Sequence, residues 1–186
     1  MSASCSTKPA EFTGENESLK PLYDLGLVGE GASIEPDREL TFAEAVMLAA
    51  RIHAGENGKS VSKSGSEWYD SYLSYAKKNS LIDEIPEDPE RPVLKYEVAK
   101  LISAVTELPK VNEIASVPDT AGTDYDEAVL ELYNSGITLG VDSRGDFLPG
   151  SKITTSDAAE LYLRALGEKE PITGTLDKVT DDDAYK

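Results

Sequence analysis

The sequence has few of the residues that build disulfides, metal sites and nucleophilic active sites. Its 186 residues include one cysteine, one histidine and one tryptophan. A single cysteine cannot form an intramolecular disulfide, and one cysteine with one histidine cannot make a zinc cluster. A Ser-His-Asp triad would have to use His53, which falls at the end of a predicted helix. We therefore expect no metal, no cofactor and no enzymatic activity.

Positive charge is also scarce, since 18 lysines and arginines stand against 35 aspartates and glutamates. The formal net charge of −17 repels nucleic acid and anionic membrane surfaces, so we expect neither as a partner. Carboxylate pairs for glycoside hydrolysis remain formally possible. Because so many acids supply such pairs in any fold, however, they indicate no particular site.

Long apolar runs are missing as well. No stretch approaches the 18 consecutive apolar residues that a membrane-spanning helix needs, so we expect no membrane span. The N-terminal segment MSASCSTKPAEF lacks the apolar core of a signal peptide. We expect residues 1–16 to form a flexible lead, with any export signal located upstream of it.

The sequence does contain an apolar pattern that occurs three times, after Thr41, after Leu94 and after Thr154. Each copy has the i, i+3, i+4, i+7 spacing of an amphipathic helix. The three stripes are Ala45, Leu48, Ala49 and Ile52; then Val98, Leu101, Ile102 and Val105; then Ala158, Leu161, Tyr162 and Ala165.

Each stripe is preceded by a second apolar run, in residues 22–28, 72–82 and 128–138. These runs end near Gly26, Ser80 and Gly136, where a left-handed helix end favours glycine. Loops rich in glycine, proline and aspartate follow, and such loops do not continue a helix. The sequence therefore predicts an all-α protein made of three helix-loop-helix units.

Capping residues mark the starts of the three striped helices. Thr41 with Glu44 fits a capping box, in which each side chain satisfies the other residue's backbone N–H. Thr154 with Asp157 repeats the pattern with a shorter acid. The middle unit has Leu94 at the cap and keeps only Glu97, so we expect this helix to depend more on packing.

The residues of these units resemble bacterial S-layer homology repeats. The resemblance rests on LTFAE at 40–44, on EWYDSYLSYAKKNSLI at 67–82 with RPVLKYEVAKLI at 91–102, and on VPDT at 117–120 with YDEAVLELYNSGITLGVDSRGDFLPGSKITTSD at 125–157. It implies three repeats in a pseudo-threefold arrangement around a central helical bundle. The repeats would span residues 17–60, 61–112 and 113–167, followed by an acidic tail over 168–186.

The same resemblance implies a function at the cell surface. Repeats of this family bind negatively charged, pyruvylated cell-wall polysaccharide in grooves between repeats, and so attach the parent protein noncovalently to Gram-positive cell walls. The family's groove arginine is replaced here by Phe42, Lys95 and Thr155. We therefore expect Lys95 to bind the ligand, with Trp68 as a stacking surface and with Arg144 and Lys152 as neighbouring cations.

Other interpretations of these residues remain open. Trp68 also fits the role of an anchor in the hydrophobic core. Lys95 also fits the role of a solvated lysine at the start of a helix. Arg144 lies between two aspartates, Asp142 and Asp146, which favour local ion pairs. The loss of all three arginines also leaves open a degenerate protein-interaction module whose acidic faces bind a basic surface protein or a metal-bridged partner.

Overall fold

The computed structural model describes residues 19–28 and 35–176 of the chain. These residues form six α-helices and no β-strand, which confirms the all-α expectation. The predicted lead at residues 1–16 lies outside the described residues. The helices are α1 (Lys20–Asp24), α2 (Phe42–Glu56), α3 (Asp70–Lys78), α4 (Lys95–Val105), α5 (Asp126–Asn134) and α6 (Thr155–Ala165).

The predicted caps start the three longest helices. Thr41 and Glu44 form a full capping box on α2: the Thr41 hydroxyl accepts from Glu44 N at 3.2 Å, and Glu44 accepts from Thr41 N. On α6 the Thr154 hydroxyl accepts from Asp157 N, also at 3.2 Å. On α4 the Glu97 carboxylate accepts from Leu94 N at 2.9 Å, while the Leu94 side chain has no acceptor to offer. The predicted caps of α2 and α4 are confirmed, whereas on α6 only the threonine half of the predicted box forms.

The three shorter helices begin two residues before the predicted apolar runs and end before a left-handed residue. Gly26, Ser80 and Gly136 have φ angles of 69°, 59° and 75°. Glycine adopts this conformation without steric cost, whereas Ser80 adopts it with a side chain. The helix ends were predictable because the left-handed position has a strong residue preference.

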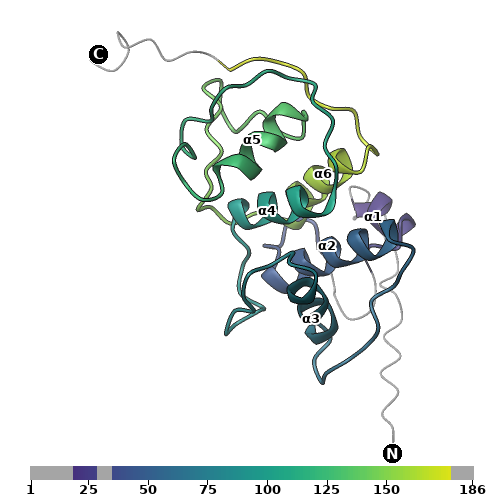
Figure 1. Ribbon diagram of the computed structural model, residues 1–186. Helices are drawn as coiled ribbons and strands as arrows, with labels where there is room; N and C mark the ends of the chain where they lie inside the picture. The colour runs from purple at the N-terminus through teal and green to yellow at the C-terminus, as the bar shows by residue number, and fades with distance from the viewer. Residues whose placement is uncertain (1–18, 29–34, 177–186) are drawn as a thin grey trace, which may run out of the picture.

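Many of the contacts between helices join different predicted units. In the middle of the molecule α2 contacts α4, and α4 contacts α6 (Figure 1). Each short helix packs against a long helix of another predicted unit: α3 against α2, α5 against α4, and α1 against α6. The buried apolar side chains form a single cluster to which all six helices contribute.

The three segments that lead into α2, α4 and α6 are joined by backbone hydrogen bonds. In each case the first helical N–H donates to a carbonyl of a neighbouring segment at 2.9 Å. Each segment therefore contacts the other two. The donor and acceptor pairs are Phe42 with Arg91, Lys95 with Ser151 and Thr155 with Arg38, and isolated antiparallel bridges pair Thr41 with Pro92, Leu94 with Lys152 and Glu39 with Thr154.

The first part of the predicted tail lies against the third unit. Ile172 N donates to the Gly136 carbonyl at 2.7 Å, and the Asn112 side chain bonds both Ile172 and Gly174. The Leu176 side chain packs on the core cluster. Residues 168–176 thus form contacts with the end of α5, and the rest of the predicted tail lies outside the described residues.

Candidate functional site

Lys95 is the predicted ligand residue with the most buried charge. Its ammonium donates to the Phe147 carbonyl at 2.6 Å and lies 4.6 Å from the centroid of the Phe147 ring. Burial lowers the pKa of Lys95, and the nearby Asp157 and Asp119 act in the opposite direction. The lysine therefore has an intramolecular partner that supports the loop before α6.

Trp68 is half-buried just before α3 and packs on the hydrophobic core. Its ring meets the Tyr69 ring edge-on, with centroids 5.5 Å apart, and its indole N–H lies 3.4 Å from a Glu90 oxygen. Among the described residues, it shares no hydrogen bond or ring contact with Lys95. The structure thus favours the core-anchor interpretation of Trp68 over a stacking surface beside Lys95.

The two other predicted cations each lie beside a carboxylate. Arg144 donates to Asp146 at 2.8 Å and lies 3.7 Å from Asp142, so the local ion pairs expected from the sequence are present. Lys152 lies 3.6 Å from Glu39, and both side chains are about half exposed. Of the four predicted ligand residues, Lys95 and Lys152 are brought close by the backbone, through the bridge between Leu94 and Lys152.

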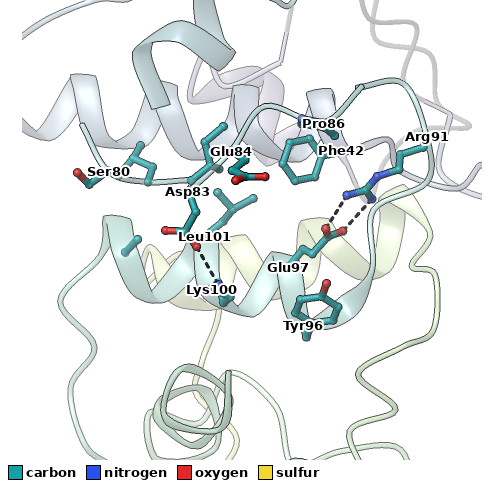
Figure 2. Close-up of a pocket in the computed structure, with 13 residues that line it drawn as sticks. Phe42, Ser80, Asp83, Glu84, Pro86, Arg91, Tyr96, Glu97, Lys100 and Leu101 are labelled. Atoms are coloured by element: carbon teal, nitrogen blue, oxygen red, sulfur yellow. Dashed lines mark hydrogen bonds and ion pairs between the residues drawn. The ribbon is translucent and has the colours of Figure 1, made fainter. Parts of the chain in front are cut away.

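A pocket of about 380 Å³ lies elsewhere, where the start of α2 faces α4 (Figure 2). This volume falls within the usual range of small-molecule sites. Phe42 contributes from α2, and the loop after α3 contributes residues 80–84 and Pro86. The other wall consists of Arg91 and side chains of α4, including Tyr96, Glu97 and Lys100. The pocket therefore lies where the first and second predicted units meet.

Arg91 places a cation over the ring of Phe42. Its guanidinium carbon lies 4.9 Å from the centroid of the Phe42 ring, and its two terminal nitrogens bond the Glu97 carboxylate at 3.0 and 2.7 Å. Two parallel bonds of this kind fix the plane of the guanidinium. The hydrogen bond to Glu97 raises the pKa of Arg91, so its charge is permanent.

The remaining charged side chains of the pocket lie nearer to solvent. Lys100 pairs with Asp83 at 3.4 Å, and the Asp83 side chain is almost fully exposed. Glu84 has no hydrogen bond or ion pair with any other described residue. In Figure 2 its carboxylate points into the pocket, on the side of the Phe42 ring. The pocket lining thus carries three carboxylates against two cations.

Arg91 was not predicted as a site residue from the sequence, and Phe42 was interpreted only as a lost arginine. A signal was present, because Arg38 and Arg91 each stand six residues before the glutamate that caps the next helix. Both pairs form: Arg38 also bonds Glu44 through two nitrogens, at 2.9 and 2.6 Å. The third segment has Ser151 at this position, so the pattern occurs twice and not three times.

A second pocket, of about 320 Å³, opens between the end of α1 and the end of α2. Arg51 crosses it and donates to the Tyr72 hydroxyl and to the Leu27 carbonyl. Nearby, His53 Nδ1 lies 2.8 Å from the Tyr75 hydroxyl. These contacts of Tyr72 and Tyr75 fix α3 on α2.

The part of the chain described by the structure has no cluster of three or more potential metal ligands. Within the same residues, no helix has the length and apolar character to cross a membrane. Comparisons of the chain with protein-family models and with curated proteins give no match.

Proposed function

We propose that this protein attaches noncovalently to a bacterial cell surface by binding a wall polysaccharide between its helix-loop-helix units. The observation that carries this proposal is the pocket at the contact between the first two units. Its lining combines apolar side chains and the Tyr96 ring with a few charged groups, the mixed composition that is usual for small-molecule sites. The location would then be extracellular, on the cell wall.

A pseudo-threefold arrangement of the three units is part of the proposal. It is supported by the equivalent hydrogen bonds that join the segments before α2, α4 and α6. It is also supported by the helix contacts, because each short helix packs on the long helix of a different unit. Such an arrangement places one groove at each contact between units. The groove between units one and two contains the pocket, which Phe42 and Tyr96 line.

Binding to purified cell walls tests this function. We expect retention on sacculi that carry their secondary polysaccharide and loss of retention on stripped sacculi. Tyr96→Ala should weaken retention because Tyr96 lines the pocket. The Tyr96 ring stacks on the Tyr125 ring, with centroids 4.6 Å apart, but Tyr125 does not line the pocket. Tyr125→Ala is therefore the matched control, because it removes the same stack and leaves the pocket lining in place. Equal retention on both kinds of sacculi would refute the proposal.

A protein-interaction module is the second candidate, because a specific surface favours it. The loop after α3 carries five acids within residues 83–90, and the exposed Ile85 lies among them. Such a surface suits a basic partner protein. Retention on stripped sacculi that disappears after protease treatment of the sacculi would support this candidate over the polysaccharide.

A further inference from the structure

The cations of the pocket are already engaged by carboxylates of the same chain. Both terminal nitrogens of Arg91 bond Glu97, which also caps α4 through Leu94 N. An acidic ligand that displaced Glu97 from Arg91 would leave the Glu97 carboxylate with little access to solvent and no cation beside it. Such a change has a large unfavourable free energy. Lys100 is likewise paired with Asp83. The pocket therefore has little to offer an anionic sugar.

A cationic group finds a better environment in the same pocket. The lining has one more carboxylate than cations, and the whole chain has a net charge of −17. Glu84 has no partner among the described residues, and its carboxylate can accept hydrogen bonds from an ammonium group. Apolar surface for the C–H groups of a sugar ring comes from Ile82, Pro86 and the partly exposed Tyr96, since Phe42 is only 6% exposed and lies against Arg91. The pocket volume of about 380 Å³ leaves room for a sugar ring.

We propose that this pocket binds an amino sugar with a free ammonium group, and that Glu84 accepts the hydrogen bonds of that group. This inference rests on the polysaccharide-binding function proposed above and specifies its ligand class. The ligand would be a de-N-acetylated hexosamine unit of a wall glycan. The acidic sugars expected from the family resemblance would bind elsewhere on the chain or not at all.

Calorimetric titration of the full chain with defined oligosaccharides tests the inference. The probes are a glucosamine tetramer, its fully N-acetylated form and a galacturonic acid tetramer, compared at one ionic strength and pH 6. We expect the glucosamine tetramer to bind about tenfold more tightly than either of the others, as expected for a ligand that makes several favourable charge contacts. Tighter binding of the acetylated or the acidic tetramer would overturn the inference.

Two variants in one loop locate the binding. Glu84→Gln should weaken binding of the glucosamine tetramer by about fivefold, the upper range for a charge pair near the surface. Glu87→Gln makes the same change of net charge on the same loop, but Glu87 does not line the pocket. It should change the affinity by less than about twofold, because salt screens the more distant charge. Equal effects of the two variants would contradict the role of Glu84.

The remaining outcomes separate this inference from the proposed function. Tetralysine with an acetylated N-terminus and an amidated C-terminus has four positive charges, like the glucosamine tetramer, but no sugar ring. If it binds as tightly, the pocket recognises charge and the amino-sugar assignment is wrong. If no oligosaccharide binds, the assignment is wrong as well, and retention on sacculi then decides independently whether the protein binds wall polysaccharide.

Discussion

At the scale of single residues, the contacts that position the pocket are ion pairs between an arginine and a capping glutamate. Arg91 with Glu97 fixes the pocket wall, and Arg38 with Glu44 has the same form at the start of α2. The identity of each capping glutamate was predictable from its spacing to Thr41 or Leu94. Its arginine partner was not recognised, because the sequence does not say which cation a folded loop brings to a helix start.

Glu44→Gln should lower the free energy of unfolding by about 2 kcal/mol, the usual size of a hydrogen bond to a charged group. The Glu44 side chain is only 4% exposed and its partner Arg38 is 34% exposed, so water compensates for the loss only in part. Glu39→Gln is the control. Its side chain is 49% exposed and pairs with Lys152 at 3.6 Å, so the change should stay within about 0.5 kcal/mol. Urea unfolding of both variants gives the comparison, and equal losses would contradict it.

At the scale of secondary-structure elements, the period of the apolar residues predicted the long helices, and caps fixed their starts. The short helices were predicted two residues late, because their first turns carry polar residues such as Asp70 and Asp126. The contacts between elements were not predictable from the period. A stripe of apolar residues says that a helix face is buried, but it does not say which helix covers it.

The cap of α4 can be improved. Leu94 has the extended backbone of an N-cap, with φ −92° and ψ 151°, but no side-chain acceptor for the N–H groups of the first turn. Leu94→Thr should therefore be more stable than Leu94→Ala by about 1 kcal/mol. The alanine variant is the reference, because both substitutions remove the apolar leucine side chain. Chemical denaturation measures the difference, and equal stability of the two variants would show that this cap position needs no acceptor.

The glycines after α5 and α6 give a matched test of the contact with residues 171–176. Both have left-handed φ angles, 75° at Gly136 and 76° at Gly167. A Cβ at Gly136 would lie 2.7 Å from the Ile172 carbonyl oxygen, whereas a Cβ at Gly167 meets no described atom within 4 Å.

Alanine at Gly167 should therefore cost about 1 kcal/mol, from backbone strain alone. Alanine at Gly136 should cost about 3 kcal/mol, because a displaced contact adds to this strain. Thermal unfolding compares the two variants. Similar losses would mean that residues 171–176 do not pack as described.

At the scale of the whole molecule, the third unit closes the structure. Helix α6 packs on α1 and α4, and the buried Tyr162 hydroxyl donates to the Ala45 carbonyl of α2 at 3.0 Å. Removal of residues 115–186 should therefore abolish the cooperative unfolding of the remaining helices, as judged by circular dichroism. A truncated chain that keeps the melting temperature of the full chain would mean that the units fold separately.

The proposed function also belongs to this scale, since the pocket needs Phe42 from one unit and α4 from the next. Lys95, the residue singled out from the sequence, instead bonds the Phe147 carbonyl. The pocket thus lies at a contact between predicted units, but not at the contact where Lys95 lies. At the pocket, the fold brings Arg91 over the Phe42 ring.

Amide chemical shifts of the full chain, recorded during titration with purified wall polysaccharide, show directly whether the ligand binds in the pocket between the first two units. We predict saturable shifts in residues 80–86, in Phe42 and in the α4 residues that line the pocket, which are Tyr96, Glu97, Lys100, Leu101 and Ala104. Tyr96→Ala should weaken this binding. Shifts centred on Lys95 and Phe147, or no shifts at saturating polysaccharide, would contradict binding in this pocket.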